Sequence, residues 1–154
     1  MKSTVIKYGG YGLLVGVIIF TLHLVFGIKN LDYSTNEILG YVSIFISLSF
    51  VFFGIKHYRD KINYGLISLR KAVAIGVLIS LLVGIGIGIA DFVYTKFIDP
   101  DFFSNYEQML IDKGREDEII EMTSTTASLF MVALVTVIGF IISLISGLIL
   151  QRKN

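Results

Sequence analysis

The stretch AVAIGVLISLLVGIGIGIA, residues 72–90, contains no Asp, Glu, Lys or Arg. Three further stretches share this property, at residues 8–28, 38–55 and 129–150. A helix needs about 20 apolar residues to cross a hydrocarbon core roughly 30 Å thick, and backbone polar groups in lipid must be satisfied within the segment. The pattern therefore predicts four transmembrane helices, at about 8–28, 38–55, 72–92 and 127–150, in a single membrane domain covering residues 1–154.

The composition of the whole chain favours the same class of protein. Of the 154 residues, 55% are hydrophobic and 16% are charged, whereas a soluble domain has roughly a quarter of its residues charged. The net charge of +1 argues against nucleic acid as a partner, because nucleic-acid-binding domains usually carry a basic excess. The chain has no cysteine, which excludes disulfides, thiolate metal sites and a cysteine nucleophile. We therefore expect an all-α integral membrane bundle, with the lipid bilayer as the partner that surrounds it.

The cations divide into two groups along the chain. Nine lie at the two termini and in the connection between the second and third spans: Lys2, Lys7, Lys56, Arg59, Lys61, Arg70, Lys71, Arg152 and Lys153. The other connections hold four: Lys29, Lys96, Lys113 and Arg115. By the positive-inside rule the larger group is cytoplasmic. The sequence thus predicts a multi-pass protein of the inner (cytoplasmic) membrane with both termini inside, and all the acids except Asp60 on or near the outer side.

An acidic segment, residues 99–121, separates the third and fourth spans. Asp99 followed by Pro100 predicts the start of a helix, with Asp99 as its N-cap. Apolar residues then recur at spacings of three and four, at Phe102, Phe103, Tyr106, Met109 and Leu110. We expect this short amphipathic helix either to lie on the outer membrane surface or to pack over the helix ends. Gly114 predicts a break, after which residues 115–121 could form a second acidic piece that runs on into the fourth span.

Several short runs, spread over nearly the whole chain, resemble one known family. They are GIKHYRDK at 54–61, GLIS at 65–68, KA at 71–72, GVLIS at 76–80, DPDF at 99–102 and SLISGLILQRK at 143–153. The chain resembles the DUF4199 family of small bacterial membrane proteins, which are common in Bacteroidota and whose function is unknown. The resemblance implies a four-helix integral membrane protein and supplies no catalytic residue.

Small residues recur four apart in three of the predicted helices. They are Gly12 and Gly16 in the first, Gly76, Ser80, Gly84 and Gly88 in the third, and Gly139, Ser143 and Gly147 in the fourth. Such spacing places each set on one helical face, where small side chains let two helix backbones approach closely. We expect these faces to pack the helices within the bundle, and homo-oligomerisation is the alternative.

Two ionisable residues are candidates for an ion or proton site. Asp91 directly follows the charge-free stretch of the third span, and an ionisable group at membrane depth is a functional candidate by default. Its position near the outer end also suits a boundary charge or a structural hydrogen bond. His23 lies inside the first span, where it could relay protons or make one interhelical hydrogen bond.

No pattern in the sequence indicates an enzyme, a metal or a cofactor. Histidine spacings typical of zinc sites and the Ca²⁺-loop order of acids are both missing, and no G-x-S-x-G nucleophile elbow occurs. The sequence therefore predicts a non-enzymatic structural or accessory subunit that packs with itself or with a larger envelope membrane protein. The alternative is a small oligomeric transporter or channel that uses Asp91 and His23.

Overall fold

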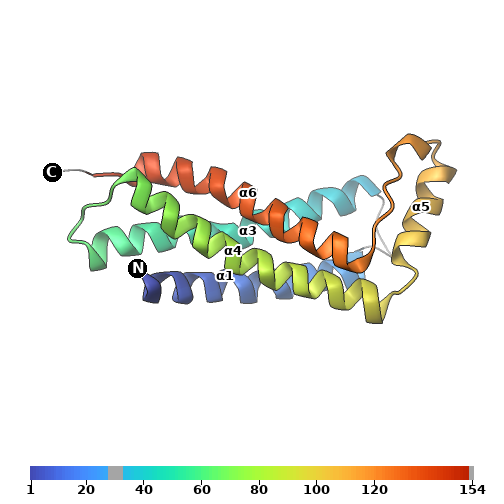
Figure 1. The fold of residues 1–154 in the computed structure, drawn as a ribbon, viewed down its shortest axis with the longest axis horizontal. Helices are drawn as coiled ribbons and strands as arrows, with labels where there is room; N and C mark the ends of the chain where they lie inside the picture. The colour runs from blue at the N-terminus through green and yellow to red at the C-terminus, as the bar shows by residue number, and fades with distance from the viewer. Residues whose placement is uncertain (28–32, 153–154) are drawn as a thin grey trace.

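The computed structural model describes residues 1–27 and 33–152 (Figure 1). Within this part of the chain four helices are long and apolar enough to cross a membrane. They are α1 (Lys2–Leu22), α3 (Tyr33–His57), α4 (Leu69–Val93) and α6 (Ser124–Leu150). The prediction of an all-α bundle with four membrane-spanning helices is confirmed. Lys29, Asp32 and Lys153, which entered the charge prediction, lie outside the described residues.

Three of the long helices continue into a π-helical turn. These turns are η1 (His23–Gly27) after α1, η2 (Tyr58–Ile62) after α3 and η3 (Tyr94–Ile98) after α4. The helices thus run beyond the charge-free stretches at several ends, because charged residues are acceptable in a helix once it leaves the hydrocarbon core.

Helix α4 occupies the centre of the bundle. It packs against α1, α3 and α6 and is the most buried of the four spans. The start of α1, the end of α6 and the α3–α4 connection lie at one end of the bundle, which we call the termini end (Figure 1). Helix α5 (Phe102–Asp112) lies across the opposite end, which we call the α5 end.

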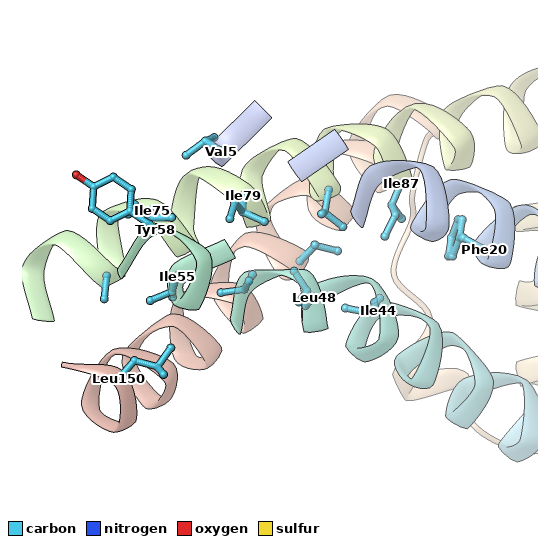
Figure 2. Packing of buried hydrophobic residues seen from close by; sticks show 14 of the residues in the cluster. Val5, Phe20, Ile44, Leu48, Ile55, Tyr58, Ile75, Ile79, Ile87 and Leu150 are labelled. Carbon is cyan, nitrogen blue, oxygen red and sulfur yellow. The ribbon is translucent and has the colours of Figure 1, made fainter. Parts of the chain in front are cut away.

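A continuous apolar core runs along the bundle between α3, α4 and α6. Its fully buried members recur at helical spacing: Leu48, Val51 and Ile55 of α3, Ile75, Ile79, Val83 and Ile87 of α4, and Val135 of α6. Figure 2 shows the labelled side chains, among them Leu48, Ile55 and Ile79, in the space between the helices. Large apolar side chains also cover the outside, for example Leu148 and Ile149 of α6. A helix that is apolar on all sides is typical of a membrane span.

The connections at the termini end are held by backbone hydrogen bonds. Ile67 and Arg152 exchange both of theirs, with N···O distances of 3.1 and 2.9 Å. The Ser68 side chain caps α4 by accepting a hydrogen bond from the Lys71 N–H. Gly65 has φ +84°, a left-handed conformation that glycine adopts at little cost. The end of α6 is thereby fixed against the loop that precedes α4.

The predicted start of α5 is wrong by two residues. The helix begins at Phe102 with Asp101 as its N-cap, and no side chain caps it. Asp99 instead ends the preceding π-helical turn, where its N–H donates to the Tyr94 carbonyl at 2.9 Å. Because the α4 helix extends this far, Asp99 and Pro100 fall in the turn between the two helices.

The segment after α5 also differs from the expectation of a helical run into the fourth span. The break at Gly114 is confirmed, with φ +66°, and a short 3₁₀ turn, η4 (Glu116–Glu118), follows. Residues 119–122 are then non-helical. The reason is a new cap: Thr123 and Thr126 form a reciprocal capping box that starts α6 at Ser124.

Candidate functional site

The closest contact between α4 and α6 is a reciprocal pair of glycines and serines. Gly76 of α4 faces Ser143 of α6, and Ser80 of α4 faces Gly139 of α6. A Cβ added at either glycine would overlap the facing serine side chain. Each serine therefore occupies the space that a glycine leaves open on the opposite helix.

Each serine hydroxyl donates a hydrogen bond to a backbone carbonyl of its own helix. Ser80 Oγ donates to the Gly76 carbonyl at 2.8 Å, and Ser143 Oγ donates to the Gly139 carbonyl at 2.6 Å. This back-bonding to residue i−4 is a known habit of serine in helices. The two helices are consequently joined here by close packing, and the serines bring no unpaired polar group into the interior.

The other small residues singled out from the sequence also face neighbouring helices. A Cβ at Gly84 would lie 3.0 Å from the Val132 carbonyl oxygen, and one at Gly88 would lie 2.9 Å from the Ser128 carbonyl oxygen. Gly147 packs on Leu69 and Ala72, and Gly12 and Gly16 both pack on Ser47 of α3. All nine thus lie at helix–helix contacts inside one bundle.

Asp91 lies at the α5 end of α4. The residue is only 8% exposed, and its Oδ2 atom has no hydrogen-bond partner among the described residues. The Thr95 hydroxyl, one turn further along the helix, donates its hydrogen bond to the Asp91 backbone carbonyl at 2.9 Å and not to the carboxyl group. A buried carboxyl group without a partner is uncommon, because its desolvation is uncompensated.

Asp91 borders a cavity of about 310 Å³ that lies between α4, α5, α6 and the α5–α6 connection. We call it the Asp91 cavity. Its lining is mostly aromatic and aliphatic, with two further acids: Phe102, Phe103, Tyr106, Glu107, Glu118, Ile120, Met122, Ala127, Phe130 and Met131. No lysine or arginine is among these described lining residues. The cavity therefore combines an apolar wall with negative charge.

Helix α5 brings its aromatic face to this cavity. Phe102 stacks on Tyr106 with ring centroids 6.5 Å apart and packs against the bundle core, while Leu110 is 1% exposed. Of the two positions expected for this helix, it takes the one over the helix ends. The apolar face of this amphipathic helix thus forms one wall of the Asp91 cavity.

Glu118 is the one lining acid with an ion-pair partner in the described part of the chain. Arg115 Nε donates to Glu118 Oε1 at 2.7 Å. This hydrogen bond, together with the positive charge of Arg115, holds the pKa of Glu118 below its usual range. Glu118 is thus partly neutralised, and Asp91 faces the cavity without such a partner.

His23 is not among the residues that line the Asp91 cavity, and it lies in the π-helical turn after α1. Neither of its ring nitrogens has a hydrogen-bond partner among the described residues, and its ring lies beside Gly40 of α3. No hydrogen bond therefore joins the His23 ring to the Asp91 carboxyl group among the described residues. The connection between the α1 and α4 ends is made instead by the Tyr94 hydroxyl, which donates to the Leu24 carbonyl at 3.1 Å.

Sequence reasoning identified Asp91 but missed most of the cavity around it. Phe130 and Met131 lie inside the fourth span and read as ordinary membrane residues, and Ile120 and Met122 lie in an irregular connection. Only the apolar stripe of α5 gave a signal. Within the described residues no group of three or more acids and histidines is close enough to hold a metal ion.

Comparison with known proteins identifies one family. The family described as "Protein of unknown function (DUF4199)" matches residues 7–152, nearly the whole chain. No curated protein and no solved structure matches the chain.

Proposed function

Because the chain belongs to the DUF4199 family, whose function is unknown, we propose from its own geometry that it is a small non-enzymatic membrane protein. Its role is that of a structural or accessory subunit, which assembles with itself or with a larger envelope membrane protein. The observation that carries this proposal is the closed packing of the bundle. The described helices meet through small residues, and the interior between them is filled by aliphatic side chains.

The filled interior favours a scaffold over a channel through one bundle. Leu48, Val83 and Val135, from three different helices, are all 0% exposed, so side chains close the space between the two ends. Because the small-residue faces are already occupied inside the bundle, a partner would meet the lipid-facing surface of the helices. That surface carries large apolar side chains such as Ile141 and Ile145.

The experiment that tests the subunit role is purification in a mild detergent, followed by identification of co-purifying proteins. Crosslinking in the membrane and native mass spectrometry in lipid nanodiscs report self-association separately. A stoichiometric partner or a defined oligomer supports the proposal. A monomer without any co-purifying protein, under conditions that preserve a known membrane complex, contradicts it.

The second candidate is a small oligomeric transporter or channel that uses Asp91 and His23. Two observations favour it: both residues carry buried polar atoms without hydrogen-bond partners, and both lie toward the α5 end. The conducting path would have to form between copies of the chain. Proteoliposomes that show a pH-dependent flux, lost in Asp91→Asn but with folding intact, would support this function, and unchanged flux in that variant would exclude Asp91 from it.

We further propose that the termini end faces the cytoplasm and that the protein lies in the inner membrane. Support comes from the charges, since Lys2, Lys56 and Arg70 lie at the termini end with most of the other cations. The cysteine-free chain allows a direct test with a membrane-impermeant maleimide. Ser104→Cys on α5 should react in intact cells with a permeable outer envelope, and Ser3→Cys should react only after lysis. The reverse pattern contradicts the orientation.

A further inference from the structure

We propose that the Asp91 cavity binds an organic ammonium group carried on an apolar body. Such a site is independent of the proposed subunit role. Its elements are the unpartnered Asp91 carboxyl group, two further acids and a wall of aromatic rings.

Carboxyl groups gather at this cavity. Asp91 is more than nine-tenths buried, and no described residue donates a hydrogen bond to its Oδ2 atom. Glu107 and Glu118 line the same cavity, so a ligand would meet three carboxyl groups, of which Arg115 partly neutralises one. A cation is the ligand that compensates this charge.

The wall of the cavity is rich in aromatic side chains. Four aromatic residues line the cavity: Phe102, Phe103, Tyr106 and Phe130. Aromatic faces attract cations through the ring quadrupole, and aromatic cages are the usual sites for quaternary and alkylated ammonium groups. A strongly hydrated metal ion would gain little from such a wall. The described acids and histidines also form no metal-binding group, as a hard cation would require.

The size of the cavity suits a small organic ligand. The cavity volume of about 310 Å³ is at the lower end of the range of small-molecule pockets, which is roughly 300–1,000 Å³. It holds an ammonium group with a short apolar body. Two sources offer this chemistry: a free amine, or the headgroup of an ethanolamine lipid, since the cavity lies at the end of a membrane span.

The test uses the purified full chain in a maltoside detergent, titrated with benzyltrimethylammonium by isothermal calorimetry. Benzyl alcohol serves as a neutral aromatic probe, and Ca²⁺ serves as a metal probe. We expect saturable binding of the ammonium and at least tenfold weaker binding of the two other probes. Equal binding of benzyl alcohol and benzyltrimethylammonium, or the absence of ammonium binding, overturns the proposal.

Variants assign the binding to this cavity. Asp91→Asn keeps the size of the side chain and removes the charge, and we expect its dissociation constant for the ammonium to rise at least tenfold. Asp101→Asn is the matched control, because Asp101 is an exposed acid at the same end of the bundle and does not line the cavity; its constant should change less than twofold. If Asp91→Asn does not fold, Glu107→Gln takes its place, and we expect its dissociation constant for the ammonium to rise at least threefold. If the dissociation constant rises by a similar factor in the cavity variant and in Asp101→Asn, the assignment to this cavity is contradicted.

A second arm distinguishes the two sources of the ammonium. The protein is reconstituted in nanodiscs with phosphatidylethanolamine or with phosphatidylglycerol alone, and native mass spectrometry counts the lipids that stay bound. Retention of phosphatidylethanolamine by the wild type, lost in Asp91→Asn and displaced by benzyltrimethylammonium, assigns the site to a lipid headgroup. Ammonium binding without such retention assigns it to a free amine. Lipid retention that Asp91→Asn leaves unchanged overturns the lipid assignment.

Discussion

The contact between Gly76 and Ser143 makes a sharp prediction about bundle stability. A Cβ added at Gly76 would overlap the Ser143 hydroxyl, would lie 2.6 Å from Ser143 Cβ and would lie 2.9 Å from Val51 Cγ1. The three atoms belong to two other helices, so they cannot all retreat together. Gly76→Ala should therefore push α4 away from α6 and α3.

The expected cost follows from the number of atoms that must move. Overpacking a well-filled interior by one methyl group costs about 1–3 kcal/mol, and the better helix propensity of alanine returns up to about 1 kcal/mol. We expect Gly76→Ala to lower the free energy of unfolding by about 1–2 kcal/mol. Adding Ser143→Gly removes both overlapping atoms of the serine, so the double variant should show a favourable coupling of about 1 kcal/mol or more.

The free energy of unfolding is measured by reversible unfolding in SDS. Energy transfer between two dyes, attached to cysteines introduced at the ends of α4 and α6, monitors the separation of these helices. The chain has no cysteine of its own, so the labels are placed uniquely. Gly10→Ala is the matched control: an added Cβ at Gly10 meets no atom within 4 Å, and we expect no loss of stability there.

Two results would refute the reasoning. If Gly76→Ala is as harmless as Gly10→Ala, the two helices do not depend on the missing Cβ for their approach. If Ser143→Gly gives no rescue in the double variant, the destabilisation of Gly76→Ala arises somewhere other than the Gly76–Ser143 contact.

Three further predictions concern the α5 end. Thr123→Ala removes the side-chain cap of α6 and should cost about 1 kcal/mol in the same SDS assay; an unchanged midpoint would mean that the cap is dispensable. Tyr94→Phe leaves the Leu24 carbonyl without its donor and should cost about 0.5–1.5 kcal/mol, with no change expected in helix content by circular dichroism. Glu118 has a lowered pKa in the folded protein because Arg115 hydrogen-bonds its carboxylate. Its ion pair therefore contributes above the ordinary carboxyl pKa and is lost as the pH falls through the lowered value. An NMR titration of Glu118 should show this low midpoint, and Arg115→Gln should raise it; the same midpoint in both proteins would contradict the ion pair.

The sequence predicts the four spans well because a membrane imposes a simple rule on composition. Charges are excluded from the hydrocarbon core, so each charge-free stretch marks a span. The same rule cannot locate helix ends, since a helix continues into the interface. The helix that begins as α4 at Leu69 remains helical as far as Ile98, whereas the charge-free stretch ends at Ala90. Local capping decides the ends instead, and it placed the start of α6 after Thr123.

The Asp91 cavity was beyond sequence reasoning for a different reason. Asp91 is conspicuous in the sequence because it interrupts the charge-free pattern. The wall around it is assembled from α5, from the irregular residues 119–122 and from the start of α6. Phe130 has the same apolar character whether it faces lipid or a cavity, so only the spatial arrangement distinguishes the two.

The register of α4 against α6 explains why a cavity forms at this place. The close contacts follow the antiparallel pair in steps of four residues, from Gly76 opposite Ser143 to Gly88 opposite Ser128. In this register Asp91 lies one turn beyond Gly88 and opposite the first turn of α6, which begins at Ser124. The π-helical turn η3 extends α4 past the start of its partner. The fit of Ser143 beside Gly76 and of Ser80 beside Gly139 holds α4 and α6 in this register. The aromatic face of α5 covers this end of α4, and the space that remains between α4, α5, α6 and the α5–α6 connection is the Asp91 cavity.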